Sequence, residues 1–233
     1  MANKNAQDNQ RESSRASGRF FFLFVFLLVD LVLFPYAVHQ NTISLWFRLL
    51  NVLVVISSVY AVSFHRRVWI VALVLAVPVV LNRGIIHEIA ASKLGLVGVV
   101  INIVFDIFII VVIFERAFQT REVTADAVFA AISIYLLIGT TFANIYEILV
   151  ILQHGAFYLD PVLNHHYAAS RPDLSYYSFV TMTSLGAVGI SPVSDQARSL
   201  TMLESVLGIL YLGVFVSRLI AIYKPPADSG AQP

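Results

Sequence analysis

The sequence contains no cysteine and few charged residues. Without cysteine, disulfide bonds, thiolate catalysis and cysteine-ligated zinc sites are excluded. Charged residues make up 12% of the 233 positions and hydrophobic residues 58%, whereas about a quarter of the residues in a soluble domain are charged. This composition is typical of a membrane protein. The formal net charge of +1 is too small to indicate binding to nucleic acid.

Signals that would indicate secretion or catalysis are also missing. The first apolar run carries Asp30, lacks a small-residue cleavage site and is followed by further apolar runs, so we expect a retained helix rather than a cleaved signal peptide. The sequence has no Gly-rich phosphate loop, no H-E-x-x-H motif and no nucleophile–base set. We therefore expect neither an enzyme nor a bound cofactor or metal.

What is present is a series of apolar stretches of about 20 residues, the length that a bilayer requires. We predict an all-α membrane protein with six transmembrane helices, of which the first four form a bundle over residues 19–115. Polar tails at residues 1–18 and 224–233 flank them, and the first has the composition of a disordered segment. The six stretches are Phe20–Val38, Ser44–Phe64, Val68–Glu88, Leu94–Phe114, Thr124–Gln153 and Ser199–Tyr223.

The distribution of basic residues predicts the orientation of these helices. Ten of the 15 Lys and Arg residues fall at one set of alternate helix ends. Because cytoplasmic loops carry the excess of basic residues, we expect both termini to be cytoplasmic. The long connection Gln153–Arg198 then faces outward.

That connection contains a segment of unusual character, Tyr176–Pro192 (YYSFVTMTSLGAVGISP). Asp173 after Pro172 is placed as an N-cap and predicts a helix over Leu174–Thr183. A helix this short cannot span a bilayer. A short helix that enters and returns is tolerated at membrane depth only where protein buries it or where it lines a watery cavity, so the segment predicts a re-entrant pore loop.

Residues 124–223 resemble the pore domain of the potassium-channel superfamily, particularly bacterial members with one pore loop per subunit. The resemblance rests on LLIGTTFANIYEILV in the fifth stretch, on YYSFVTMTS, and on ISPVSDQARSLTMLESVLGILYLGVFVSRLI. It implies a homotetramer in the lipid of a bacterial inner membrane that passively conducts monovalent cations, K⁺ or Na⁺. It also implies a pore helix to which Tyr176, Tyr177, Thr181 and Thr183 belong.

The selectivity filter departs from the family pattern T-x-G-Y-G-D. Aligned without gaps, the chain has Ser184, Leu185, Gly186, Ala187, Val188 and Gly189 at these positions. Carbonyl rings replace the hydration shell of the ion, and their geometry needs residues with positive φ, which glycine adopts at little cost and valine does not. We therefore expect altered or weak selectivity. A gapped alignment that pairs Gly186 and Gly189 as the two filter glycines is an alternative.

Three further residues of the pore domain match positions of the family. Gly208 matches the hinge glycine of the family's inner helix, or it permits close packing between helices. Glu147 and Glu204 match acidic family positions and are expected to support the filter by hydrogen bonds from behind.

The first four stretches lack the signature of a voltage sensor. Leu94–Phe114 has no basic residue and carries Asp106 instead, whereas a sensor needs several Arg or Lys residues at a spacing of three. We expect the charged residues of these stretches to pair with one another inside the bundle. They are Asp30, Arg48, Arg83, Glu88 and Asp106.

Three histidines, His154, His165 and His166, lie in the outward connection near Asp160. They belong to an exposed loop or form a metal or proton sensor.

Two other functions compete with conduction. One is a non-conducting channel-like scaffold or regulatory subunit, and the other is a secondary transporter. A transporter would show an internal repeat with paired interrupted helices, and no such repeat is evident. We expect no large soluble ligand-binding domain.

Overall fold

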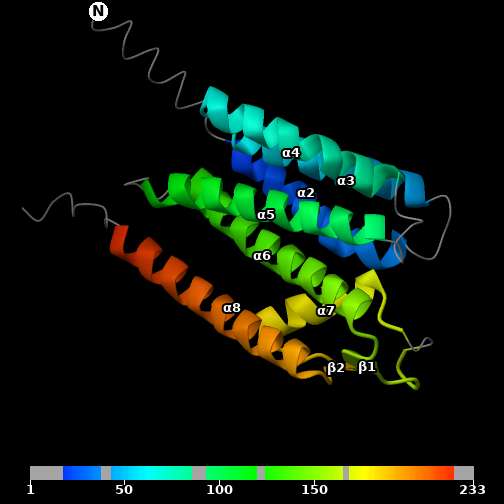
Figure 1. The fold of residues 1–233 in the computed structure, drawn as a ribbon. Helices are drawn as coiled ribbons and strands as arrows, with labels where there is room; N and C mark the ends of the chain where they lie inside the picture. Colours follow the sequence, from blue (N-terminus) through cyan, green and yellow to red (C-terminus); the bar gives the residue numbers. More distant parts are fainter. Residues whose placement is uncertain (1–17, 38–42, 86–92, 120–123, 165–167, 223–233) are drawn as a thin grey trace, which may run out of the picture.

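The computed structural model of the protein describes residues 18–37, 43–85, 93–119, 124–164 and 168–222. Within these ranges the chain forms seven helices and one two-stranded sheet (Figure 1). The prediction of a mainly helical protein is therefore confirmed. The predicted tails, apart from Gly18, lie outside the described residues, as do Glu88, His165 and His166.

Four helices build the N-terminal bundle, and each corresponds to one of the predicted apolar stretches. They are α2 (Arg19–Ala37), α3 (Ile43–Ala61), α4 (Arg66–Ile85) and α5 (Lys93–Gln119). Helix α3 packs between α2 and α4, α4 packs on α5, and both α2 and α5 lie against α6 (Figure 1). The contact faces are filled by fully buried aliphatic side chains such as Leu23, Val79 and Ile109.

The C-terminal part contains two long helices with a shorter one between them. Helix α6 (Ala125–Leu152) is followed by β1 (Phe157–Leu159), α7 (Arg171–Met182), β2 (Ile190–Pro192) and α8 (Asp195–Ile222) (Figure 1). Strand β1 pairs antiparallel with β2, so that Tyr158 lies opposite Ser191. We call the end of the molecule at which these strands lie the strand end.

A carboxylate of α6 joins the two parts at the opposite end of the molecule. Asp126 accepts hydrogen bonds from the backbone N–H groups of Gly18 and Phe20, at 3.1 and 3.3 Å. These groups begin α2 and have no partner within that helix, and the negative charge is favourable at a helix N-terminus. Asp126 therefore fixes the start of the bundle to the start of α6.

Three of the helices are long and apolar enough to cross a bilayer among the residues that the structure describes. They are Gly95–Ala117 of α5, Ala125–Leu152 of α6 and Asp195–Arg218 of α8. In α3 the apolar part is shorter, Arg48–Ala61. The chain is thus an integral membrane protein by composition, and the membrane-spanning role of α2, α3 and α4 stays a prediction.

Helix α8 differs from α6 in how little of it the chain itself covers. Its apolar window is only 11% buried, against 56% for α6. Exposed apolar side chains occur on several sides of α8, including Met202, Leu203 and Leu212. Lipid can cover one side of such a helix, and the remaining sides are available to further copies of the chain.

Gly208 lies at the midpoint of α8, where the end of α7 meets it. A β-carbon built on Gly208 would lie 2.5 Å from the carbonyl oxygen of Met182. This oxygen belongs to the backbone and cannot move aside without shifting α7. Close packing is therefore one role of Gly208, and its role as a gating hinge stays a prediction.

We expect Gly208→Ala to lower the free energy of unfolding by about 1–3 kcal/mol, the cost of overpacking a filled interior. Unfolding of the purified protein in detergent, followed by tryptophan fluorescence, measures this change. Gly213→Ala is the matched control, because no atom lies within 4 Å of a β-carbon at Gly213. Equal effects of the two substitutions would contradict the packing role of Gly208.

Candidate functional site

The short helix α7 enters from the strand end and stops halfway along α8. At its start the Arg171 Nε lies 2.6 Å from Glu147 Oε2, close to the C-terminal end of α6. At its end the Met182 carbonyl packs against Gly208 and accepts a hydrogen bond of 3.3 Å from the Tyr135 hydroxyl. The chain then returns through β2 to the start of α8. The segment therefore enters and leaves at the same end, as a re-entrant loop does.

The start of α7 corrects the sequence prediction. Ser170, not Asp173, is the N-cap, and the helix begins at Arg171 rather than Leu174. Pro172 is accommodated in the first turn because its missing N–H would have no helical partner there. The Asp173 carboxylate instead reaches back and accepts hydrogen bonds from the backbone N–H and the hydroxyl of Ser170, at 2.8 and 2.5 Å.

The end of α7 is closed by the backbone. Leu185 N donates to Val180 O at 2.9 Å, and Ser184 N donates to Thr181 O at 3.0 Å. This pair of bonds is the Schellman motif, in which glycine usually takes the left-handed position. Here Ser184 takes it, with φ of 58°. Ser184 is thus a helix-ending residue, and its role at an ion site stays a prediction.

We call residues 183–188 the pore loop, and most of its surface is uncovered. Thr183, Ser184, Leu185, Gly186 and Val188 are exposed, whereas Ala187 is half-buried. Within the part of the chain that the structure describes, no hydrogen-bond donor reaches the carbonyl oxygens of these six residues. The loop therefore presents free carbonyls at the end of a helix, where the helix dipole is negative.

Two glycines of the predicted filter adopt positive φ, and Val188 does not. Gly186 has φ of 79° and Gly189 has φ of 83°. Valine avoids this region because its branched side chain would clash with the backbone. The backbone thus places its left-handed residues where the gapped alignment puts its two glycines.

The carbonyl of Gly189 is bonded to the loop that follows β1 rather than to the pore loop. Its carbonyl oxygen accepts hydrogen bonds from Asp160 N at 2.9 Å and from Asn164 Nδ2 at 2.7 Å. A β-carbon at Gly189 would lie 2.9 Å from Asn164 Nδ2. Only glycine combines the required φ with this close approach. Because both bonds hold the carbonyl of Gly189, this oxygen is directed away from the pore loop.

A fully buried carboxylate joins α6, α7 and α8. Glu204 Oε1 lies 2.5 Å from Ser178 Oγ, and Glu204 Oε2 accepts a hydrogen bond of 2.5 Å from the Tyr146 hydroxyl. The Ser178 hydroxyl is also 2.8 Å from the Gly139 carbonyl of α6. Hydrogen bonds to a charged group are worth about 1.5–3 kcal/mol each in a protein interior, so this contact fixes the depth at which α7 sits.

The two adjacent tyrosines of α7 face different neighbours. Tyr177 is buried edge-on between Tyr146 and Phe157, with ring centroids 5.3 and 5.1 Å away, and its hydroxyl is 2.7 Å from the Thr201 hydroxyl. Tyr176 is 46% exposed, and its hydroxyl accepts a long hydrogen bond of 3.5 Å from Val188 N. Tyr176 therefore contacts the pore loop directly, whereas Tyr177 holds α7 against α8.

The remaining predicted site residues lie on the same short helix or beside it. Thr181 is buried and offers its carbonyl to Ser205 Oγ at 3.4 Å. Thr183 is exposed, and its hydroxyl bonds back to the Phe179 carbonyl at 2.7 Å. Glu147 is bound to Arg171, so both predicted supporting carboxylates contact α7, one at its start and one at its middle.

Sequence reasoning missed Tyr146 and Arg171, which contact these carboxylates, and Asn164, which contacts the Gly189 carbonyl. No sequence motif marks these three residues, because each one contacts a residue that is distant in the sequence. A weak signal exists for Tyr146, since an aromatic residue with a hydroxyl inside an apolar helix needs a buried hydrogen-bond partner.

Two acidic residues of the bundle accept hydrogen bonds from amide side chains. Asp30 accepts a hydrogen bond from Asn51, and Asp106 accepts one from Asn144, both at 3.3 Å. Asn51 and Asn144 therefore contact these two carboxylates, and the expected pairing between charged residues stays a prediction. The His154 side chain is exposed, and no cluster of three or more metal-binding side chains occurs among the residues that the structure describes.

Comparison with known families agrees with this geometry. Residues 123–224 match a protein-family model described as an ion channel. This part of the chain is an ion-channel domain. The resemblance to the potassium-channel superfamily is thereby confirmed, as is the expectation of a channel rather than an enzyme. No curated protein and no solved structure matches the chain.

We expect Tyr146→Phe to lower the free energy of unfolding by about 1–3 kcal/mol, because Glu204 loses a donor that no water can replace in a fully buried position. Unfolding in detergent measures the effect. Tyr158→Phe is the control, since Tyr158 is 55% exposed on β1. A Tyr146→Phe protein as stable as the control would contradict the role of this hydrogen bond.

Proposed function

We propose that the protein is a homotetrameric channel that passively conducts monovalent cations with weak selectivity between K⁺ and Na⁺. The observation that carries the proposal is the pore loop itself, which follows the C-terminal end of a helix that stops halfway along α8. Its residues are mostly exposed, and their carbonyls accept no hydrogen bond from the described residues. Carbonyl oxygens and the negative end of a helix dipole both favour a cation over an anion.

Assembly into a tetramer is supported by the surface of the single chain. One chain supplies one pore loop, which can form only part of a filter around a central axis. Helix α8 is largely uncovered by its own chain, and Leu185 and Val188 of the pore loop are 78% and 68% exposed. Further copies packed against α8 would bring their pore loops together and cover these side chains.

Weak selectivity is supported by the backbone of the loop. Strong selection needs several successive rings of carbonyls at fixed spacing. In the pore loop only Ser184, which ends α7, and Gly186 have positive φ, and the carbonyl of Gly189 is bonded to Asp160 and Asn164. We infer fewer ion sites than in a family filter. The natural setting of such a channel is the bacterial inner membrane, with both termini in the cytoplasm.

A second candidate function keeps the architecture without conduction. Leu185 and Val188 place two apolar side chains on the loop that would line the axis, and an apolar constriction can close a pore by excluding water. The chain would then be a channel-like scaffold or a regulatory subunit. A secondary transporter is disfavoured because the matched family is that of ion channels.

We expect the purified tetramer in liposomes to pass both Na⁺ and K⁺ in an ion-flux assay. The double substitution Ala187→Tyr and Val188→Gly is expected to raise the ratio of K⁺ to Na⁺ flux, because it restores a residue that adopts positive φ easily. Gly189 is left unchanged, since its conformation excludes other side chains. Val162→Gly is the control, because Val162 is exposed outside the pore loop.

Native mass spectrometry establishes that the tested preparation holds four chains. Flux equal to that of empty liposomes would overturn the proposal of conduction. If the double substitution then created K⁺ flux in the silent protein, the scaffold function would be supported instead.

A further inference from the structure

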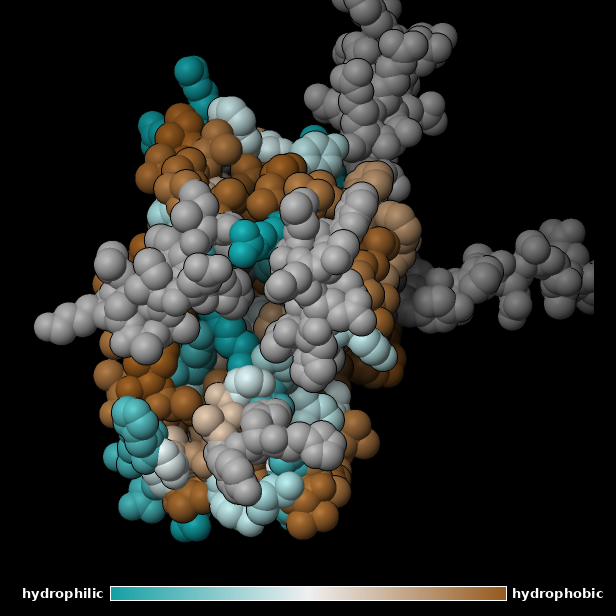
Figure 2. All heavy atoms as spheres, turned by 90° about the vertical axis from the view of Figure 1, so that its right-hand side faces the viewer, coloured by the Kyte–Doolittle hydropathy of each residue, from teal (hydrophilic) through white to brown (hydrophobic). Residues whose placement is uncertain are grey.

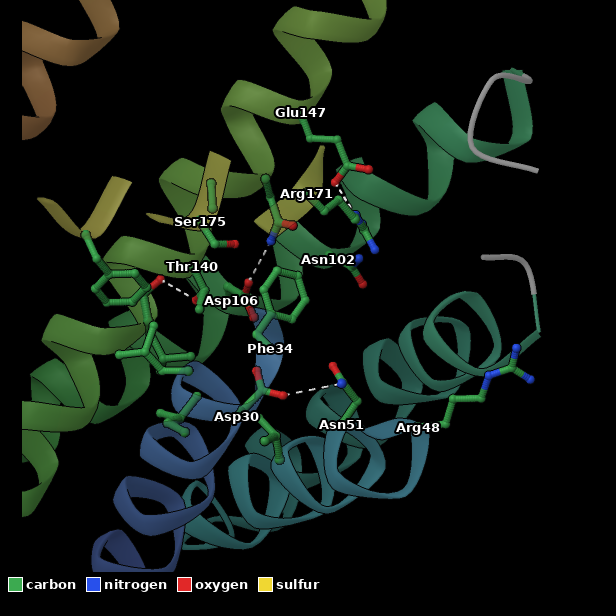
Figure 3. Close-up of a pocket in the computed structure, with 17 residues that line it drawn as sticks. Asp30, Phe34, Arg48, Asn51, Asn102, Asp106, Thr140, Glu147, Arg171 and Ser175 are labelled. Atoms are coloured by element: carbon green, nitrogen blue, oxygen red, sulfur yellow. Dashed lines mark hydrogen bonds and ion pairs between the residues drawn. The ribbon is translucent and has the colours of Figure 1, made fainter. Parts of the chain in front are cut away.

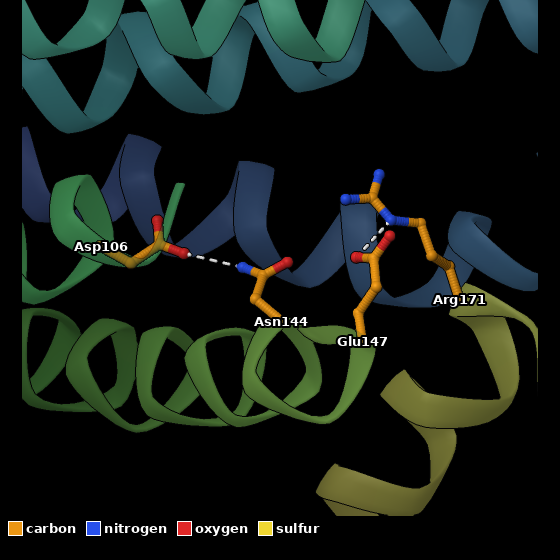
Figure 4. A network of polar contacts seen from close by, with 4 residues as sticks. All are labelled: Asp106, Asn144, Glu147 and Arg171. Atoms are coloured by element: carbon orange, nitrogen blue, oxygen red, sulfur yellow. Dashed lines mark hydrogen bonds and ion pairs between the residues drawn. The ribbon is translucent and has the colours of Figure 1, made fainter. Parts of the chain in front are cut away.

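The two ends of the N-terminal bundle differ in how their charged residues are bonded. At the strand end a polar cavity of about 90 Å³ lies between α2, α3, α5, α6 and α7 (Figure 3). Figure 2 views this end and shows hydrophilic atoms between the hydrophobic flanks of the helices. Charged residues on the cavity wall have partners within the chain, as in the ion pair of Glu147 with Arg171 (Figure 4). Arg19, at the opposite end of the bundle, is bonded differently.

Arg19 begins α2 and packs on two aromatic rings. Its guanidinium carbon lies 5.4 Å from the centre of the Tyr60 ring and 5.2 Å from that of the Phe64 ring, within the range of cation–π contacts. Its Nε atom is buried, yet no described residue accepts a hydrogen bond from it. Buried N–H groups nearly always have a partner, and one without a partner in the chain is often bonded to a ligand or to water.

A second guanidinium group shares the Phe64 ring. Arg116, near the end of α5, lies 4.5 Å from the centre of this ring, and it makes a further interaction within the chain. Phe64 lies in the turn between α3 and α4, and the exposed residues Arg66 and Arg67 follow it directly in α4. Three separate segments therefore bring arginines to one ring. We call Arg19, Phe64 and Arg116 the arginine site.

The arginine site lies at the level where two membrane-crossing stretches end. The apolar stretch of α5 ends at Ala117, next to Arg116, and that of α6 begins at Ala125. Asp126 of α6 accepts hydrogen bonds from the first turn of α2, so Arg19 is held at the start of α6. Figure 1 shows these helix ends on the side opposite to β1 and β2. The polar headgroup layer of a bilayer begins where the apolar stretches end.

Two aromatic residues near the site agree with this level. Tyr60 and Trp69 are 47% and 43% exposed, and Tyr and Trp are enriched where a membrane protein passes from hydrocarbon to headgroups. Phospholipid phosphates are therefore the anions that lie beside Arg19 in a membrane.

We propose that the arginine site binds the phosphate group of an anionic phospholipid. The planar fork of a guanidinium group matches two phosphate oxygens, and stacking on the rings fixes the orientation of the Arg19 fork. In a zwitterionic lipid the cationic group of the headgroup competes for its own phosphate, whereas phosphatidylglycerol has no such group. Arg66 and Arg67 favour the same class of lipid, because basic residues at the membrane surface attract anionic headgroups.

This site is separate from the pore loop and does not depend on the proposed conduction. Its residues belong to the N-terminal bundle, and it is present once in every chain. An ion-flux assay without a signal would therefore leave lipid binding unaffected.

Native mass spectrometry of the purified full-length protein in a non-ionic detergent tests the proposal, because it counts the lipid molecules bound per chain. Phosphatidylglycerol and phosphatidylcholine with the same acyl chains are titrated separately. We expect one phosphatidylglycerol per chain to bind at least about fivefold more tightly than phosphatidylcholine, the factor that one basic residue contributes beside an anionic lipid.

Substitutions locate the bound lipid. Arg19→Gln should remove most of the preference, and Arg19→Lys should weaken binding about threefold, because lysine keeps the charge but has no planar fork. Glu115→Gln should strengthen binding, since Glu115 is exposed directly beside Arg116 and its charge repels a phosphate. This gain cannot result from misfolding. Arg198→Gln is the matched control, because it removes the same charge from an exposed arginine at the strand end.

Three results would count against the site. Equal binding of the two lipids, or phosphatidylglycerol binding that Arg19→Gln leaves unchanged, would overturn the proposal. A loss of the same size in Arg198→Gln would show a general attraction of basic residues and would overturn it as well. Displacement of the bound lipid by millimolar inorganic phosphate would overturn the assignment to a phospholipid.

Discussion

The buried carboxylate of Glu204 is the contact on which the arrangement of the C-terminal half depends. Glu204 lies on α8, and its carboxylate contacts the hydroxyl groups of Tyr146 on α6 and of Ser178 on α7. A helix as short as α7 cannot reach across a bilayer, so its position must be fixed by protein contacts. A polar contact inside the apolar interior has few alternative partners, and it therefore specifies one depth and one rotation for α7.

The other contacts of α7 complete this specification along its length. Arg171 and Glu147 hold its first turn, the aromatic rings around Tyr177 hold its middle, and Gly208 allows its last carbonyl to reach α8. Polar contacts set the direction of α7, while aromatic and glycine contacts set its distance from the long helices. Together they hold the pore loop at a fixed point, although the loop itself makes few bonds.

Much of the fold follows from the sequence, because apolar length and charge spacing are local properties. The sequence predicts the helical stretches and the short helix before the loop. It also predicts that Glu147 and Glu204 contact this region. The start of α7 was not predictable, because Pro172 fits equally well before an N-cap and inside a first turn. The cavity between α2, α3, α5, α6 and α7 could not be predicted either. In the sequence Asn102 is a single polar residue of an apolar helix, and only the fold brings five helices together around it.

The anchoring of Gly189 to Asp160 and Asn164 has a consequence for protein engineering. Gly189 and residues 160–164 form one structural module, because the carbonyl of Gly189 accepts the hydrogen bonds that Asp160 and Asn164 donate. A filter transplanted from another channel would bring a carboxylate where this chain has Gly189, and the amide of Asn164 would occupy its space. Chimaeras should therefore exchange residues 157–192 as a single block rather than the filter alone.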